Sequence, residues 1–252
     1  MNRAYWMESK FELLKMARLR QYSMSTICFP LMFYCFFGLA MAPKSHIGAI
    51  SVSQYLLATY GAFGVMGATL YAFGAGVAVE RGMGWLEVKR ASPMPPAAYL
   101  VAKAVVSLTF GAAVVTLLFA MGAIFGGIRM PASQWAVLWS VLVAGAIPFG
   151  AIGLAIGNFA GPNSASGVVN MIYLPLGFLG GLWLPVHLLP PALQQAAPYL
   201  PSYHFAQLAL SIVRVPIQGT VAGHVEALAG FGILFAGIAW IGQSRDRDKI
   251  YG

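Results

Sequence analysis

The charged residues of this chain gather in a few short segments, and the stretches between them are long and apolar. Only 9% of the 252 residues are charged and 59% are apolar, whereas about 25% of the residues in a soluble domain are charged. A helix needs about 20 apolar residues to cross the roughly 30 Å hydrocarbon core of a bilayer. Lipid cannot satisfy open backbone groups, so such segments must be helical. We therefore expect an all-α integral membrane protein.

Six apolar stretches are long enough to be membrane spans. We expect them at residues 25–41, 54–79, 97–125, 135–159, 167–184 and 226–241. Glycines recur along the second and fourth spans, where they permit close approach of helices. Nothing in the sequence divides the chain, so residues 1–252 are expected to form one transmembrane domain.

Residues 1–22 are too charged to span and predict a helix lying in the membrane interface. One helical face carries Trp6, Leu13 and Ala17. The opposite face carries the charged residues Glu8, Glu12 and Lys15. We expect the apolar face to contact lipid and the charged face to contact water.

Two further segments interrupt the spans. Residues 80–96 are the most polar internal stretch and end in prolines, which predicts a short surface helix between the second and third spans. Residues 185–210 hold five prolines yet stay apolar. Prolines at this density exclude a straight helix, so a broken re-entrant segment at the outer face is expected between the fifth and sixth spans.

The distribution of Lys and Arg predicts the orientation. With six spans both termini lie on one side, and placing them in the cytoplasm leaves only Lys44, Arg129 and Arg214 of the 15 basic residues outside. The net charge of +8 is thus explained by topology, and no nucleic-acid partner is expected. We predict a multi-pass protein of the cell membrane with both termini cytoplasmic.

No chemistry of its own is expected of this chain. It lacks the Gly-x4-Gly-Lys-Ser/Thr loop that would hold ATP. Cys28 and Cys35 lie about 10 Å apart along one helix, too far for a disulfide. His187, His204 and His224 have no acidic partners at metal-binding spacing and are interpreted as structural. We predict no catalytic residue, bound cofactor or metal ligand.

Three stretches together resemble the permeases of type-2 ABC exporters. The first runs from Glu80 to Met94, with an acid, a Gly-aromatic turn and a proline-ended helix. The second, Tyr99-Leu100-Val101-Ala102-Lys103, opens the third span, and the third is Gly180-Gly181-Leu182-Trp183-Leu184-Pro185. The resemblance covers nearly the whole chain, and the order of the motifs carries it.

The resemblance implies a dimer with a second permease copy or a paralogue, and cytoplasmic ATPase subunits that hold ATP and Mg²⁺. The segment 80–96 would be the coupling helix that contacts the ATPase. Its expected coupling residues are Glu80, Arg81, Trp85, Leu86, Glu87, Lys89 and Arg90. A carboxylate at the membrane edge is costly unless paired, and the candidate partners of Glu80 are Arg81 and Lys103.

Aromatic residues in the spans could line a path for cargo, although packing within one subunit is the alternative. The candidates are Phe33, Phe37, Tyr60, Phe63, Tyr173 and Phe178. The cargo is left open between a hydrophobic drug, a lipid and a glycan. The rival function is an ion-coupled secondary transporter, which would need ionisable residues within the spans and an inverted repeat.

Overall fold

The computed structural model describes residues 2–41, 46–47 and 50–251, and within them the chain is a bundle of long helices. Helix α1 (Asn2–Arg18) is followed by Leu19, whose ψ of 86° interrupts the helical backbone. Helix α2 (Arg20–Phe33) then starts in a new direction and continues as a π-helical stretch, η1 (Tyr34–Met41). The break at Leu19 separates α1 from the first span.

A short antiparallel pair of strands, β1 (His46–Ile47) and β2 (Ile50–Ser51), precedes the central helix α3 (Val52–Leu70). The Ser51 hydroxyl caps α3 by accepting a hydrogen bond of 3.1 Å from the Gln54 amide. The helix continues without a break as η2 (Tyr71–Ala75) and α4 (Gly76–Gly82). Nearly every residue of α3 is buried, because α2, α6, α8 and α11 surround it.

Three helices pack against the central helix: α6 (Pro96–Ile124) and the successive pair α7 (Ala132–Ala144) and α8 (Ala146–Phe159). The last helix, α12 (Val221–Tyr251), packs chiefly on α8. Glycines allow α8 to approach the central helix closely. A Cβ on Gly157 would lie only 2.6 Å from the Phe73 carbonyl oxygen, so residue 157 has no room for a side chain.

The segment after α9 (Ala165–Leu179) is broken into short helices, as the prolines predict. These are η3 (Val186–Leu188), α10 (Pro191–Ala196), η4 (Ala197–Tyr199) and α11 (Pro201–Ile212). Prolines stand in the first turns of α10, η4 and α11, where the missing N–H costs no helical hydrogen bond. The two longest pieces are α10, with six residues, and α11, with twelve.

Five helical segments among the described residues are long and apolar enough to cross a membrane: Tyr22–Met41, Val52–Gly82, Ala97–Ile124, Ala132–Phe159 and Val221–Ser244. Each matches an expected span. The span expected at 167–184 differs, because α9 ends at Leu179 and has 15 residues. At 1.5 Å per residue such a helix is about 22 Å long, shorter than the hydrocarbon core.

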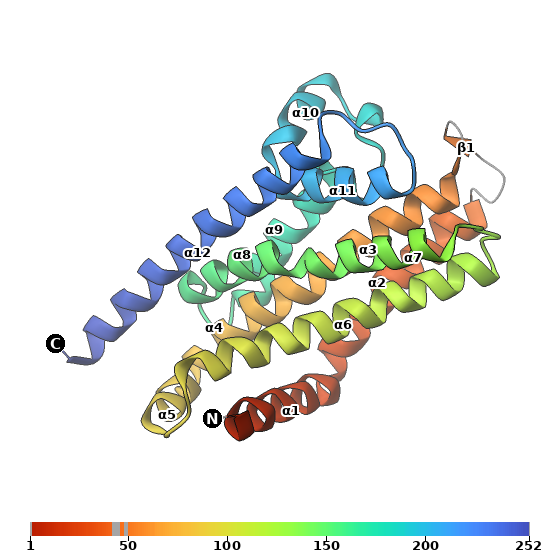
Figure 1. Cartoon of the computed structure of the whole chain (residues 1–252). Helices are drawn as coiled ribbons and strands as arrows, with labels where there is room; N and C mark the ends of the chain where they lie inside the picture. The colour runs from red at the N-terminus through yellow and green to blue at the C-terminus, as the bar shows by residue number, and fades with distance from the viewer. Residues whose placement is uncertain (1, 42–45, 48–49, 252) are drawn as a thin grey trace.

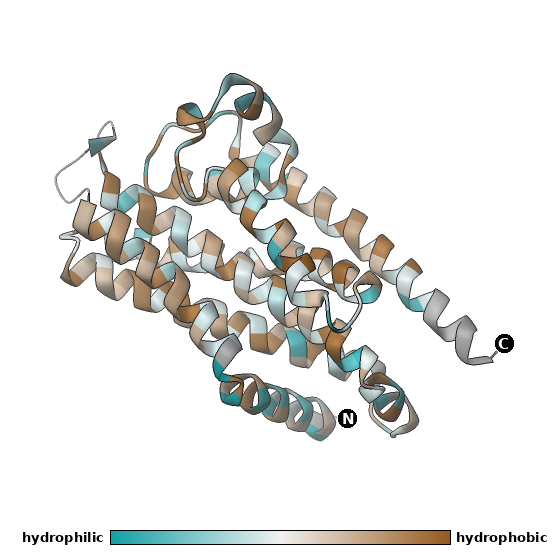
Figure 2. Cartoon of the chain, turned by 180° about the vertical axis from the view of Figure 1, so that it is seen from behind, coloured by the Kyte–Doolittle hydropathy of each residue, from teal (hydrophilic) through white to brown (hydrophobic). Residues whose placement is uncertain are grey.

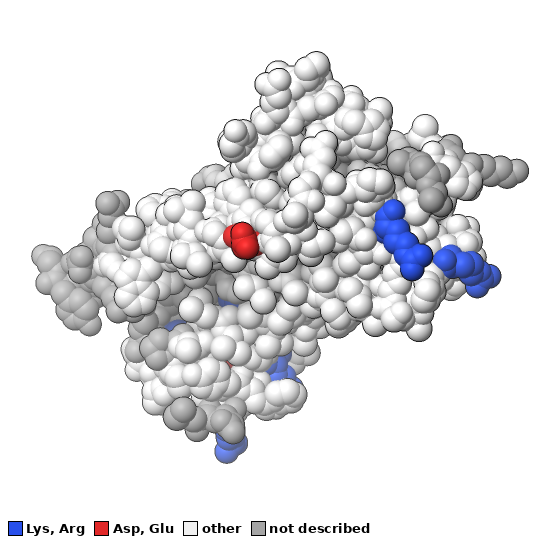
Figure 3. All heavy atoms as spheres, turned by 45° about the horizontal axis from the view of Figure 1, so that its top comes forward, with Lys and Arg blue, Asp and Glu red and all other residues white. Residues whose placement is uncertain are grey.

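The helices run between two ends of the bundle. Helices α1 and α5 (Trp85–Ala91) and the last turns of α12 lie toward one end, whereas β1, α10 and α11 lie toward the other (Figure 1). Apolar colouring dominates the long helices, and hydrophilic residues are more frequent in α1 (Figure 2). Most of the face in Figure 3 carries neither sign of charge. This pattern suits a bundle whose sides contact lipid.

Candidate functional site

Helix α5 is set off from α4 by a tight turn at Gly84. The residue has a φ of +75°, a left-handed conformation that glycine adopts without a Cβ clash. The far end of α5 is closed by Ser92, whose hydroxyl donates to the Lys89 carbonyl oxygen at 2.7 Å. Prolines at 93, 95 and 96 then start α6. The predicted surface helix is thus a seven-residue helix, bounded by the turn at Gly84 and by the hydrogen bond of Ser92.

The outward side of α5 is apolar. Trp85 is 54% exposed and Val88 61% exposed, and Met83 in the preceding turn is 68% exposed. Glu87 is also exposed, whereas Leu86 and Lys89 are half-buried. The Arg90 side chain lies outside the described residues. An exposed tryptophan beside an exposed methionine is the kind of apolar surface that is enriched at protein contacts.

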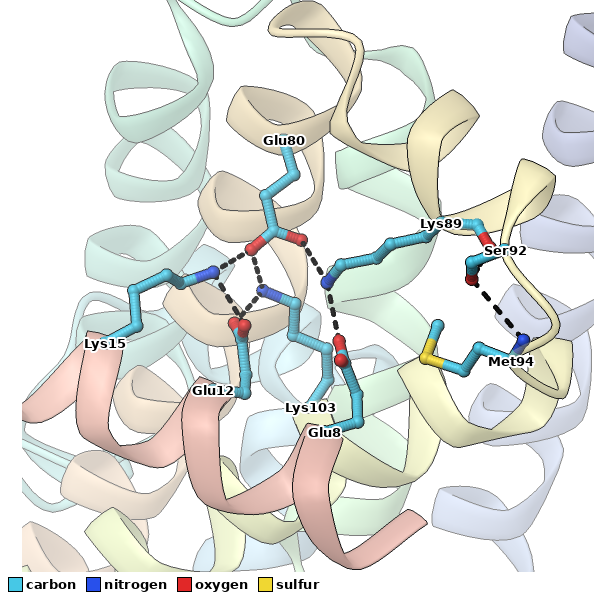
Figure 4. A network of polar contacts seen from close by, with 8 residues as sticks. All are labelled: Glu8, Glu12, Lys15, Glu80, Lys89, Ser92, Met94 and Lys103. Carbon is cyan, nitrogen blue, oxygen red and sulfur yellow. Dashed lines mark hydrogen bonds and ion pairs between the residues drawn. The ribbon is translucent and has the colours of Figure 1, made fainter. Parts of the chain in front are cut away.

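Six charged side chains meet behind α5, and we call them the charged cluster. They are Glu8, Glu12 and Lys15 of α1, Glu80 of α4, Lys89 of α5 and Lys103 of α6 (Figure 4). Three carboxylates face three ammonium groups, so the formal charges within the cluster balance. Four separate helices are joined at this point.

Lys103 lies at the centre of the charged cluster. Its Nζ is 2.5 Å from Glu12 Oε1 and 2.9 Å from Glu80 Oε1, and the Lys103 side chain is 1% exposed. A buried ammonium costs several kcal/mol of desolvation unless it is paired and hydrogen-bonded, and here two carboxylates supply the pairing. The Lys103 Nζ also lies 5.5 Å from the centre of the Tyr99 ring.

Lys89 joins α5 to the cluster. Its Nζ lies 2.7 Å from Glu8 Oε1 and 3.9 Å from Glu80 Oε2. The same Nζ lies 4.5 Å from the centre of the Tyr99 ring, within the range of a cation–π contact. Helix α5 is therefore attached to both α1 and α4 through one side chain.

Lys15 closes the cluster on the α1 side. Its ammonium group donates to Glu80 Oε1 and lies 2.7 Å from Glu12 Oε2, while 42% of its side chain stays exposed. Burial alone would lower the pKa of Lys15, but the charges and hydrogen bonds of Glu80 and Glu12 outweigh it and raise that pKa above its usual value. Lys15 therefore stays charged at any physiological pH.

Arg81, next to Glu80 in the chain, reaches the other side of the bundle. Its guanidinium donates to the carbonyl oxygens of Asn158 and Ala160, the latter at 2.8 Å, where α8 ends. The Asn158 side chain in turn donates to the Ala239 carbonyl of α12 at 2.8 Å. The end of α4 is thus fixed to α1 and α6 by one residue and to α8 by the next.

The structure unites some of the sequence-predicted coupling residues and separates others. Glu80 and Lys89 enter the charged cluster, and Lys103 is the expected partner of Glu80. Trp85 and Glu87 face outward. The contacts of Glu8, Glu12 and Lys15 with the bundle were not predicted from the sequence, since the charged face of α1 was expected to face water. A signal was present: Lys103 falls inside an apolar span and needs acidic partners.

The outward face of α1 mixes apolar and basic side chains, so it differs from the expected one: Trp6 and Ala17 are exposed, but Leu13 packs inward beside Met16. Trp6 is 70% exposed and Phe11 58%, whereas Glu12 is only 4% exposed. Burial of the acids follows from the position of Lys103 beneath α1, because the ion pairs form only if that face turns inward. Water does not cover the Glu12 carboxylate.

The six candidate path residues lie in one aromatic cluster. Phe33 lies next to Phe37 and Tyr60, with ring centres 5.7 and 6.2 Å apart. Phe63 stacks on Tyr173 at 4.3 Å with an angle of 12° between the rings.

Trp183, which the sequence analysis did not select for the path, connects these groups. Its ring lies 5.5 Å from Phe33, 5.4 Å from Phe63 and 6.5 Å from Phe178. Phe63 is fully buried. Within this single chain the aromatic cluster is therefore packed.

A cleft of about 260 Å³ adjoins the aromatic cluster. Its lining comes from three helical segments: Ser25, Thr26 and Phe29 of α2, Gly67 and Tyr71 of the central helix, and Asn170, Tyr173 and Leu174 of α9. The Tyr71 hydroxyl donates to Asn170 Oδ1 at 2.5 Å. The cleft thus combines aromatic walls with a few hydrogen-bonding groups, the usual composition of a site for a small molecule.

Comparison with known proteins identifies the family of this chain. The ABC-2 type transporter family matches residues 3–214. The chain is also 29% identical, over 207 residues, to the Bacillus subtilis (strain 168) protein named "Putative transport permease YvfS", and the match covers 82% of this chain and 84% of that protein. The matched region includes α1, the charged cluster, α5 and the aromatic cluster. The chain therefore belongs to the ABC-2 type transporter family, as a membrane permease of an ABC transporter.

Proposed function

We propose that this permease is the membrane-spanning subunit of an ATP-driven exporter in the cell membrane. It pairs with a second permease copy or a paralogue, and two cytoplasmic ATPase subunits hold ATP and Mg²⁺ beneath it. The observation that carries the proposal is the form of α5: Trp85 is exposed for a partner, while Lys89 holds the same helix to α1 and α4. Movement of α5 by the ATPase would therefore be passed to the bundle.

The proposed topology places α1, α5 and both termini in the cytoplasm. The Lys and Arg distribution supports this, and α1 and α5 share one end of the bundle (Figure 1). The five long segments and α9 give six membrane crossings if α9 and the residues that follow it cross the bilayer together. In that arrangement α10 and α11 form the re-entrant outer segment. Their backbone groups are shielded by α9, on which both pack, and by α12, on which α11 packs.

The proposed translocation path runs along the aromatic cluster and the adjoining cleft. In a dimer the cleft beside Tyr71 and Asn170 would meet its counterpart, and separation of the two copies would open the aromatic cluster. The lining suits an apolar cargo with a few hydrogen-bonding groups, such as a hydrophobic drug or a lipid, and fits a glycan less well.

The ionisable residues beside the membrane support this proposal over a secondary transporter. Glu12, Glu80 and Lys103 are paired with one another at the end of the bundle that carries α5, so they are not arranged as an ion-binding site along a path. Membership of an ABC family points to ATP as the energy source.

Crosslinking from residue 85 tests the proposal. A photoreactive amino acid at this position, in membranes that contain the full transport complex, should crosslink to the ATPase subunit. Trp85→Ala should lower transport and transport-stimulated ATP hydrolysis, since loss of a central anchor costs about 2 kcal/mol, roughly thirtyfold in affinity. Trp240→Ala, at a tryptophan of α12 that is 68% exposed, is the matched control and should transport normally.

Two outcomes would refute parts of the proposal. Normal transport by Trp85→Ala, together with no crosslink from residue 85, would show that α5 is not the coupling element. Cysteine labelling tests the orientation separately: a reagent restricted to the outside should reach Ser133→Cys and not Ser92→Cys. The reverse labelling pattern would overturn the topology.

A further inference from the structure

Helix α1 keeps its acidic side chains on the inside and most of its basic ones on the outside. Glu8 and Glu12 are bound by Lys89 and Lys103, which come from other helices. The exposed cations of α1 are Arg3, Lys10, Lys15 and Arg18, and Arg20 is exposed at the start of α2. Among these cations Lys15 is paired with Glu12, and the cations together give the surface of α1 that is turned away from the bundle a positive charge.

A shallow groove of about 450 Å³ lies on this surface, where α1 meets α2. Its lining combines two cations with three apolar side chains: Phe11, Leu14, Lys15, Arg18 and Leu19. Phe11 is 58% exposed, Leu19 49% and Leu14 39%. Exposed apolar groups beside cations, just before the span that begins at Tyr22, match the boundary between headgroups and acyl chains of a membrane.

The chemistry of the groove selects one kind of occupant. A phosphodiester would lie between the ammonium of Lys15 and the guanidinium of Arg18, which binds phosphate oxygens in a forked geometry. The first methylenes of an acyl chain would cover Phe11 and Leu14. A zwitterionic headgroup brings its own cation toward Lys15 and Arg18, so it is held more weakly than an anionic headgroup.

We propose that the groove formed by Phe11, Leu14, Lys15, Arg18 and Leu19 binds an anionic phospholipid of the leaflet in which α1 lies. Lys15 has three N–H donors, and two of them are used by Glu12 and Glu80. The third can reach the lipid phosphate from the 42% of the side chain that is exposed. The bound lipid therefore touches the same ammonium group that ties α1 to α4.

Lipid titration of the purified full-length chain tests this proposal independently of any ATPase. The delipidated protein in detergent is titrated with phosphatidylglycerol and, separately, with phosphatidylcholine, and native mass spectrometry counts the bound lipids. The wild type should retain phosphatidylglycerol in preference. Arg18→Gln should weaken its binding about fivefold, the effect of one cation near an anionic surface. Arg18→Lys should recover most of it.

Arg129→Gln is the matched control, because Arg129 is also exposed but follows α6 at the opposite end of the bundle. It should bind phosphatidylglycerol as the wild type does. Equal binding by wild type and Arg18→Gln, or equal retention of the two lipids by the wild type, would overturn the proposal. Displacement of bound lipid by millimolar inorganic phosphate would also overturn it, since a simple anion site would then explain the binding.

Discussion

The Lys103 Nζ lies 2.9 Å from Glu80 Oε1, and both side chains are almost completely withdrawn from solvent. Lys103 stands about two turns into α6 and Glu80 close to the end of α4, so the pair fixes the two helices to one another on either side of α5. Glu12 of α1 binds the same ammonium group. Three helices thus depend on a single lysine.

Replacement of Lys103 by Met should destabilise the protein by about 3 kcal/mol. Loss of one partner from a buried ion pair typically costs about 3–5 kcal/mol, because the remaining charge is left uncompensated, and Lys15 still offsets part of that charge. Equilibrium unfolding in detergent measures the effect. Lys103→Met with Glu80→Gln should recover part of the loss, and Lys10→Met, on the exposed side of α1, should change little. Equal stability of Lys103→Met and wild type would contradict this account.

Close packing between α8 and the central helix gives a second prediction. A Cβ at residue 157 would lie 2.6 Å from the Phe73 carbonyl oxygen and 2.9 Å from Val77 Cβ, so Gly157→Ala must push the helices apart. Overpacking of this kind costs about 1–3 kcal/mol. Thermal unfolding in detergent should show it. Gly237→Ala is the control: nothing lies within 4 Å of its added methyl, and alanine favours a helix by about 1 kcal/mol.

Most of the fold could be predicted from the sequence because apolar stretches and prolines act locally. The spans around 54–79 and 97–125 follow from hydropathy alone, and the short helix α5 follows from its charges and prolines. The length of α9 could not be predicted in this way. The apolar pattern continues past Leu179, and only the backbone turn at Gly181, with a φ of +79°, shows where the helix stops.

The charged cluster was predictable only in part, because it depends on how distant helices pack. The cost of an unpaired carboxylate in lipid suggests a partner for Glu80, and Lys103 lies at the right depth in the next span. That Glu8 and Glu12 also turn inward depends on where α1 lies against α6, which no local pattern specifies. In the same way, Trp183 joins the aromatic cluster through contacts with helices far away in the chain.

A pair of histidines in the α11–α12 region predicts a dependence of stability on pH. The Nδ1 atoms of His204 and His224 lie 2.9 Å apart, and His204 Nε2 lies 2.9 Å from the Pro198 carbonyl oxygen. A carbonyl can only accept, so Nε2 of His204 donates and its Nδ1 accepts from His224. Protonation of His204 would set two N–H groups against each other. Burial and His224 accordingly lower the pKa of His204.

The sign of the pH effect follows from this lowered pKa. Unfolded histidine has a pKa near 6.5, so the unfolded state takes up a proton before folded His204 does. The stability that neutral His204 contributes to the folded state is fully present above the unfolded pKa of about 6.5. It is lost as the pH falls through the lower pKa of folded His204. Thermal unfolding between pH 8 and pH 5 should show a steeper loss for the wild type than for His204→Gln. His187→Gln, at an exposed histidine, should follow the wild type; a parallel loss in all three proteins would rule out the pair as the cause.

The last prediction concerns the ion pair that joins α1 to α5, with Glu8 Oε1 and Lys89 Nζ 2.7 Å apart and each side chain about one fifth exposed. Glu8→Lys should place like charges together and loosen α5 from α1, and Lys89→Glu should do the same. Contacting pairs of this kind are coupled by about 0.5–3 kcal/mol. If α5 passes movement from the ATPase to the bundle, each single variant should lower the amount of cargo moved per ATP hydrolysed. The double variant Glu8→Lys with Lys89→Glu reverses the pair and should restore part of that ratio, measured in membranes that contain the whole complex.

The control for net charge is Glu226→Lys, which replaces an exposed carboxylate of α12 and should leave the ratio unchanged. If the double variant were no better than the two single variants, the pair would have no specific role in coupling, and the attachment of α5 would depend on the 3.9 Å contact between Lys89 and Glu80 instead.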